Sequence, residues 1–322
     1  MAYPRVLGIG EILWDRLADQ VGKPLEAVES WTDYPGGAPA NVVCSLVKLG
    51  TPAGVIGCIG QDAAGNGLIQ VLQGVGVDQT GIQRHPTAPT RIVYVTRDLE
   101  GNPTFAGFGN YRPDSFADAQ LQGTRLPMKS LQQAEFIVSG TLGLAYPASR
   151  EAIAQAILSA QQYGTRVFID INRRDVFWLE GQSSLAVIRD MVQFADFLKL
   201  TAAEAEWLFH TTDPAAIASK SRKILGVFIT DAEQGCRYWM MGHSGRVPAF
   251  TVPVVDTTGA GDSFTAGILH QLCQQGLGAF STPQAVIQLV RYATAVAALT
   301  VTQPGAISAQ PTAAEVERFL QD

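Results

Sequence analysis

The chain has 322 residues, of which 47% are hydrophobic, and carries a formal net charge of -6. This length can bury a large core and fits one large α/β domain, with or without a small appendage. An acidic chain without a long basic run disfavours nucleic acid and anionic membrane surfaces as main partners, so we expect a small-molecule substrate.

The cysteines and the N-terminus indicate the compartment. Four cysteines are scattered without a C-x-x-C pair, which indicates neither a zinc site nor a disulfide framework. The first apolar run is interrupted by Glu11, and no run reaches membrane-spanning length. We therefore expect a cytoplasmic protein without a signal peptide or membrane anchor.

Short β-branched runs alternate with longer Ala/Leu/Gln-rich stretches, which is the pattern of a parallel sheet covered by helices. The expected strands are residues 6–9, 53–58, 136–139, 166–170, 197–200, 226–230 and 250–255. The expected helices are residues 41–49, 149–163, 184–194, 202–209, 264–272 and 284–299. The sequence therefore predicts the α/β class.

Two stretches, 13–34 and 90–108, break this rhythm. Both alternate in the manner of strands, contain turn formers such as those at 100–103, and are not followed promptly by a helix. We expect them to pair into a small antiparallel sheet that stands off the main body. No repeat, linker or composition shift divides the chain, so a single domain over 1–322 is expected.

The segment from Asp256 to Asp262 reads Asp-Thr-Thr-Gly-Ala-Gly-Asp, between the expected strand 250–255 and the expected helix. A glycine turn that opens a helix directs unpaired N–H groups and the helix dipole at one point, which makes an anion site. A carboxylate there would repel a bound phosphate group, but it suits deprotonation of a hydroxyl that attacks phosphate. The alternative interpretation is that Asp262 only caps the helix.

A second glycine element, Pro35-Gly-Gly-Ala-Pro-Ala-Asn41, precedes an apolar helix. Two glycines let a neutral polyol approach the backbone, and the Asn41 amide both donates and accepts hydrogen bonds. Asp15 follows the first strand, where the carboxyl ends of parallel strands hold ligands. The alternatives are an ordinary turn and a surface aspartate.

Taken together, the motifs at 36–41, 57–65 and 256–262 resemble those of the ribokinase-like (PfkB) carbohydrate kinases in content, order and spacing. The resemblance extends from Gly8 to Gly305. Through residues 10–15, 139–147 and 170–178, the chain is most similar to the fructokinases. The resemblance implies a three-layer sandwich with a mostly parallel central sheet, and a β lid formed from 13–34 and 90–108.

The implied reaction transfers the γ-phosphoryl group of ATP to a sugar hydroxyl, most readily converting fructose to fructose 6-phosphate. Asp262 would be the catalytic base, while Arg174 would lie near the substrate or phosphate. The anion hole would consist of Gly259, Ala260 and Gly261. The sugar would contact Asp15, Gly36, Gly37, Asn41 and Asp262, and the nucleotide would contact Lys199, Thr230, Gly235, Gly259 and Gly261.

The resemblance also implies metal ions. Glu204 matches the acid of the family's Asn-x-x-Glu motif, which organises Mg²⁺ through water, although Thr201 replaces the asparagine. A monovalent cation such as K⁺ would lie near Asp256 and Thr258, with backbone carbonyls near Thr300 and Gly305.

Two departures from the family pattern concern ATP and the sugar. The nucleotide loop keeps Thr230 and Gly235 of Thr-x-Gly-x-x-Gly, but Ala232 replaces its first glycine, and Asp231 and Glu233 add negative charge. The lid arginine expected within 101–105 is missing. Either Arg91 or Arg112 replaces it, or the preferred hydroxyl pattern of the sugar differs.

Other readings of the sequence stay open. A 2-keto-3-deoxygluconate kinase or a ribokinase would use the same mechanism, whereas a non-catalytic sugar-binding or regulatory relative would not. A Rossmann enzyme is disfavoured because no G-x-G-x-x-G follows the first strand. A homodimer through the lid is also expected if the lid exposes an apolar face.

Overall fold

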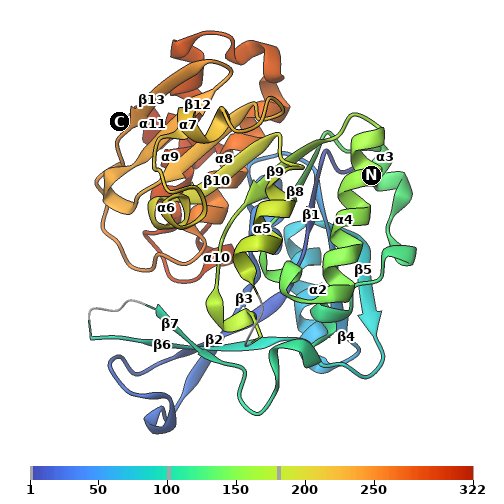
Figure 1. Ribbon diagram of the computed structural model, residues 1–322. Coiled ribbons are helices and arrows are strands. Elements are labelled where there is room, and N and C mark those ends of the chain that lie inside the picture. Colours follow the sequence, from blue (N-terminus) through green and yellow to red (C-terminus); the bar gives the residue numbers. More distant parts are fainter. Residues whose placement is uncertain (1–2, 100–102, 180–182, 322) are drawn as a thin grey trace.

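A computed structural model describes residues 3–99, 103–179 and 183–321, and it contains two separate sheets (Figure 1). The strands of the large sheet are β1 (Val6–Ile9), β4 (Ala53–Gly60), β5 (Asp78–His85), β8 (Phe136–Ser139), β9 (Arg166–Asp170), β10 (Phe197–Thr201), β11 (Gly226–Thr230), β12 (Cys236–Met240) and β13 (His243–Val247). Their order is β13-β12-β11-β10-β9-β8-β1-β4-β5. All neighbours from β11 to β5 are parallel, and β12 runs antiparallel to both of its neighbours.

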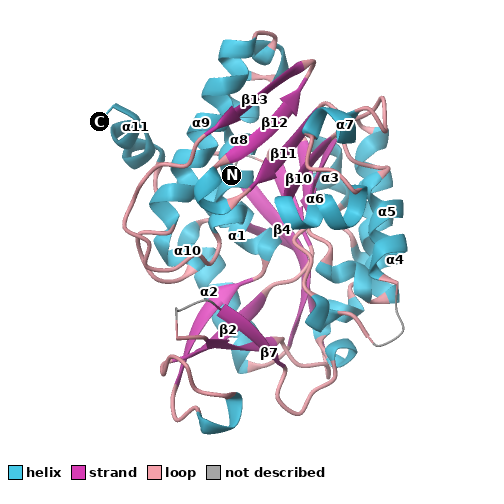
Figure 2. Cartoon of the chain, turned by 60° about the vertical axis from the view of Figure 1, so that its left-hand side comes forward, coloured by secondary structure: helices cyan, strands magenta, loops and turns pink. Residues whose placement is uncertain are grey.

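Helices cover both faces of the large sheet (Figure 2). One face carries α1 (Ala38–Lys48), α2 (Ala63–Val75), α8 (Ala260–Gln275), α9 (Pro283–Thr300), α10 (Ala306–Ala309) and α11 (Ala313–Gln321). The other carries α3 (Met128–Gln133), α4 (Pro147–Gln162), α5 (Ser184–Val192), α6 (Ala202–Phe209) and α7 (Pro214–Ala218). Successive strand residues point to opposite cores, as Phe168 does to the first and Ile169 to the second. The expected three-layer sandwich is confirmed.

The small sheet consists of β2 (Leu13–Ala18), β3 (Trp31–Gly36), β6 (Ile92–Arg97) and β7 (Pro103–Gly107), in the order β3-β2-β6-β7. Two antiparallel hairpins, β2-β3 and β6-β7, meet through a parallel pairing of β2 with β6. The central pairing is parallel because β2 follows β1 and β6 follows β5, and β1 and β5 run in the same direction. The turn expected at 100–102 lies outside the described residues.

The strand expected over 250–255 is wrong, because this segment is an irregular, extended loop. Pro253 has no N–H to donate to a strand partner, and the Val255 N–H donates instead to the Val301 carbonyl at 2.8 Å. The side chains of Val254 and Val255 are 63% and 60% exposed. The glycine turn before Asp262 therefore joins a loop, and not a strand, to α8.

The sequence does not predict every element around the large sheet. Strand β5, the β12-β13 hairpin and helix α2 were not expected, although all of them lie in the described chain. Within the described ranges, no helix is long and apolar enough to cross a membrane.

Candidate active site

A cavity of about 770 Å³ lies where the large sheet meets the small sheet. Its wall contains residues that end or follow β1, β9, β10 and β11, together with residues of β2 and β7 and of the loops before α8 and after α9. The carboxyl ends of parallel strands are the usual ligand position in such sheets, and the volume suits small molecules.

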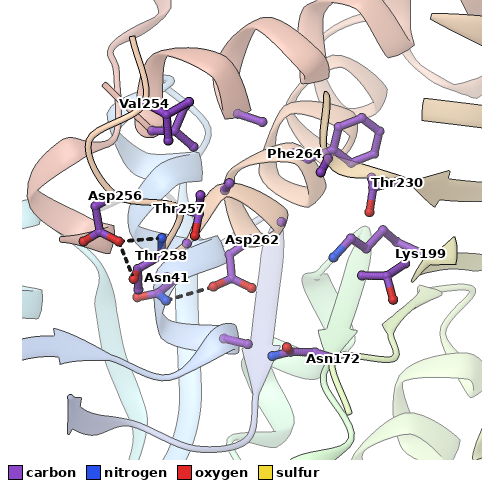
Figure 3. A pocket seen from close by; sticks show the side chains of 18 of the residues that line it. Asn41, Asn172, Lys199, Thr230, Val254, Asp256, Thr257, Thr258, Asp262 and Phe264 are labelled. Atoms are coloured by element: carbon purple, nitrogen blue, oxygen red, sulfur yellow. Dashed lines mark hydrogen bonds between the residues drawn. The ribbon is translucent and has the colours of Figure 1, made fainter. Parts of the chain in front are cut away.

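The start of α8 places Asp262 in this cavity. Gly259 caps the helix with φ 77°, a left-handed conformation that favours glycine, and a Cβ on it would lie 2.6 Å from the Cβ of Ala306. The Asn41 side-chain amide donates to a carboxyl oxygen of Asp262 at 2.8 Å (Figure 3). Burial raises the pKa of Asp262, against the opposing effects of Asn41, Lys199 and Arg174. A carboxyl with a raised pKa suits proton transfer near neutral pH.

Lys199 approaches the same turn from β10. A Cβ on Gly261 would lie 2.6 Å from the Lys199 Nζ, so the ammonium group lies directly beside the glycine backbone. Burial by itself lowers the pKa of Lys199, but the charges of Asp170, Glu204 and Asp262 raise it above its ordinary value. The turn is therefore flanked by a permanent positive charge.

Asp170 holds Lys199 in place. The Lys199 Nζ donates to Asp170 at 3.2 Å, and the Thr265 hydroxyl on α8 donates to the other carboxyl oxygen at 3.1 Å. Burial raises the pKa of Asp170 to about 6, although Lys199 opposes this shift. The sequence reading assigned Lys199 to the nucleotide but did not identify this ion pair. The pair follows from the register of β9 and β10, in which Asp170 and Lys199 lie opposite each other on neighbouring strands.

The residues predicted to bind the sugar meet opposite Asp262. A Cβ on Gly36 would collide with the Asp15 carboxylate, and Gly37 has φ 100° and contacts the Glu11 carbonyl closely. Burial, together with the charge of Asp262, raises the pKa of Asp15 to about 7. Asp15, Gly37 and Asn41 line the cavity, whereas Gly36 lies behind them.

Of the arginines considered, Arg174 lines the cavity. Its guanidinium carbon lies 5.4 Å from the ring centroid of Phe105 on β7, which connects the main body to the small sheet. Arg91 is 1% exposed and pairs with Asp118, while Arg112 is exposed and pairs with Asp114. Neither residue lines the cavity in this structure, whereas Arg174 does.

Glu204 lines the cavity and belongs to a capping box at the start of α6. The Thr201 backbone N–H donates to the Glu204 carboxylate at 2.7 Å, and the Arg173 N–H donates to its other oxygen at 2.7 Å. Thr201 is thus the N-cap residue of α6, at the position where the family has asparagine. The carboxylate is fixed in place, and its oxygen donors are the type that Mg²⁺ prefers.

Three of the four residues predicted near a monovalent cation lie together. The Asp256 carboxylate accepts from the Thr258 N–H at 2.9 Å, the Thr258 hydroxyl at 2.7 Å and the Gly305 N–H at 2.9 Å. Thr300 is fully buried, and its hydroxyl donates to Val296 within α9. The side chain of Thr300 is therefore directed into its own helix.

The nucleotide loop lies between β11 and β12. Thr230, Ala232, Glu233 and Gly235 line the cavity. Ala232 has φ 39°, the left-handed region that the glycine it replaces would adopt without strain. Asp231 lies 3.8 Å from Arg237 and does not line the cavity. Of the two acids that add negative charge to the nucleotide loop, Glu233 lines the cavity and Asp231 does not.

Comparison with known proteins agrees with this geometry. Residues 4–313 match the family model described as pfkB family carbohydrate kinase. The chain is 30% identical over 321 residues to probable fructokinase-5 of Arabidopsis thaliana, which covers 99% of this chain and 98% of the relative.

Solved structures give the same result. A fructokinase with bound ATP from Xylella fastidiosa is 29% identical, with a TM-score of 0.88 and 98% of both chains covered. A fructokinase from Vibrio cholerae O395 in a form with bound fructose, ADP and calcium ion is 29% identical, with a TM-score of 0.85 and 99% of both chains covered. The resemblance found in the motifs is thus confirmed, and the chain belongs to the pfkB family of carbohydrate kinases.

Proposed function

We propose that the protein transfers the γ-phosphoryl group of ATP to fructose and releases fructose 6-phosphate and ADP. The observation that carries this proposal is the arrangement at the start of α8. Asp262 and Asp15 line the same cavity, and the Lys199 ammonium lies beside Gly261. One helix start thus offers a proton acceptor and an anion site together.

The roles follow from this geometry. Asp262 accepts the proton of the attacking sugar hydroxyl. The N–H groups of the turn and Lys199 stabilise the negative charge on the phosphoryl group in the transition state of its transfer. Asn41 orients the Asp262 carboxylate through its 2.8 Å hydrogen bond. Asp15 and the backbone at Gly37, which lines the cavity and lacks a side chain, hold the other hydroxyls of the sugar.

We propose fructose as the substrate because the relatives named above are fructokinases and one of them is described with fructose and ADP. Arg174 together with Phe105 provides a cation and an aromatic face on the lid side of the cavity. We assign to Arg174 the contact that a lid arginine would make. A 2-keto-3-deoxygluconate kinase or a ribokinase stays the alternative.

Two metal ions belong to the proposal. Mg²⁺ would be held near Glu204 through water and ATP oxygens, and it would neutralise charge on the phosphates. K⁺ would lie near Asp256 and Thr258, whose side-chain oxygen atoms are 2.7 Å apart, with backbone carbonyls near Thr300 and Gly305. A cytoplasmic location and a homodimer stay predictions, the dimer forming through the outer strands β3 or β7 of the small sheet.

The test is ADP release with ATP and Mg²⁺ across fructose, ribose, 2-keto-3-deoxygluconate and glucose. We expect turnover on fructose, and we expect Asp262→Asn to lower kcat by about two to four orders of magnitude while calorimetry shows sugar binding retained. Glu317→Gln, an exposed acid on α11, is the matched control and should leave turnover unchanged. Near-normal turnover of Asp262→Asn would remove it as the base, and silence on every sugar with binding intact would favour the non-catalytic relative.

A further inference from the structure

Glu11 is a buried acid that the proposed mechanism does not use. It lies between β1 and β2, is 3% exposed and contributes to the cavity wall. One carboxyl oxygen accepts from the Ala38 N–H at 2.9 Å. The other oxygen is buried without a hydrogen-bond partner among the described residues. A buried carboxyl with one free oxygen is costly, so its retention needs an explanation.

The hydrogen bond of Glu11 reaches the helix that carries Asn41. Ala38 is the first residue of α1, and Asn41 lies one turn later, where its N–H donates to the Gly37 carbonyl at 2.9 Å. Asn41 then donates to Asp262. A continuous path of hydrogen bonds and one helical turn therefore leads from Glu11 to the proposed base.

The surroundings of Glu11 disfavour a negative charge. Burial raises the pKa of Glu11 to about 8, against the opposing backbone hydrogen bonds, which include the one from Ala38. The charges of Asp118, between β7 and α3, and of Asp262 on α8 add to the upward shift. The charge of Glu11 also contributes to raising the pKa of Tyr146, which lies directly before α4. Arg91 is already paired with Asp118. No cation among these groups is left to neutralise an ionised Glu11.

We propose that Glu11 is a positioning residue of the acceptor site that works as a neutral carboxylic acid, holding the first turn of α1 and thereby the Asn41–Asp262 pair. The proposal rests on the proposed function, because it assigns Asp262 and Asn41 to the acceptor. An ionised Glu11 would place a third negative charge near Asp262 and Asp118 and would loosen the turn.

The sign of the pH effect follows. Because the folded state binds the Glu11 proton more tightly than the unfolded chain does, the wild type loses stability as pH rises from about 4.5 to about 8. Above about 8 the folded protein also loses the proton, and the acceptor site loses its order. Sugar turnover should therefore decline on the alkaline side for this reason.

The experiment compares Glu11→Gln with Glu11→Leu. Glutamine keeps the acceptor for Ala38 and cannot ionise, so at pH 7 kcat and the KM for fructose should stay within about threefold of wild type. Between pH 8 and 10, wild-type kcat/KM for fructose should fall about tenfold per pH unit, a decline that Glu11→Gln should lack. Leucine leaves the Ala38 N–H without its acceptor and should raise the KM for fructose about tenfold, with the KM for ATP unchanged.

A second measurement needs no substrate. The unfolding midpoint of Glu11→Gln, relative to wild type, should rise steadily between pH 5 and 8. Glu317→Gln, at an exposed acid on α11, is the control and should lack this rise. A constant difference for Glu11→Gln, or a glutamine variant as impaired as the leucine variant, would overturn the proposal. Because this arm is independent of catalysis, it separates a wrong role for Glu11 from a wrong choice of sugar.

Discussion

At the scale of single residues, the position of Lys199 beside Gly261 is central to the site. Anion holes built from backbone N–H groups are often supplemented by a cation, and here the cation is buried and fixed by Asp170. A charge held in place needs little reorganisation when negative charge develops on the transferring group. The position of Lys199 therefore explains how a turn that also carries Asp262 can still accept a phosphoryl group.

Lys199→Met should lower kcat by about two to three orders of magnitude with little change in the KM for fructose, because the lost cation acts on the phosphoryl group and not on the sugar. The variant also leaves the buried Asp170 without its ion-pair partner, and breaking a buried pair costs about 3 to 5 kcal/mol of unfolding free energy. Steady-state kinetics and urea unfolding measure the two effects separately.

The double variant Lys199→Met with Asp170→Leu is the control for this prediction. Removing both charges should restore most of the lost stability without restoring turnover. Recovery of turnover in the double variant would show that Lys199 only neutralises Asp170 and has no role toward phosphate.

At the scale of elements, the nucleotide loop between β11 and β12 shows how an unfavourable motif is accommodated. Asp231 is directed toward Arg237, outside the cavity, and Ala232 takes the left-handed conformation of the missing glycine. The loop keeps its shape, and Gly235 with φ 83° closes it where a side chain would collide with Val247. Of the two acids in the loop, Glu233 is the one that lines the cavity.

Glu233→Gln should lower the KM for ATP about two- to threefold at low ionic strength, because an exposed carboxylate repels the triphosphate only weakly. The effect should shrink as salt increases. Asp231→Asn is the matched control and should leave the KM for ATP unchanged. Equal effects of the two substitutions would mean that the whole loop, and not the cavity-facing acid, sets the affinity.

The success of sequence reasoning also differs by element. The core strands of the large sheet could be predicted because each is a β-branched run buried on both faces, as in β1 and β8. Strand β5 was missed because it is an edge strand with few apolar residues. A strand was wrongly predicted at 250–255 because Val254 and Val255 are exposed, and the amino-acid sequence does not show whether a valine is exposed or buried. The Lys199–Asp170 pair depends on which strands are neighbours, and that is a property of topology.

At the scale of the whole molecule, the small sheet is joined to the main body by a buried charge and not only by apolar contacts. Arg91, directly before β6, is 1% exposed and forms two hydrogen bonds of 2.7 Å with Asp118. Its guanidinium also lies 4.5 to 5.1 Å from the ring centroids of four aromatic residues, Phe108, Phe116, Tyr146 and Phe177. These contacts of Arg91 with Asp118 and the aromatic residues fix the position from which the small sheet extends over the cavity.

Arg91→Met should therefore destabilise the protein by about 3 to 5 kcal/mol, because Asp118 would keep a buried charge without its partner and the aromatic rings would lose their cation. Urea unfolding measures this loss. Arg112→Met, which breaks the exposed pair with Asp114, should leave the unfolding midpoint unchanged. Because Arg91 orients the sheet that carries Asp15, residual activity of the folded Arg91→Met protein should show a raised KM for fructose and an unaltered KM for ATP. Loss of stability with both KM values unchanged would reduce Arg91 to a core residue without influence on the site.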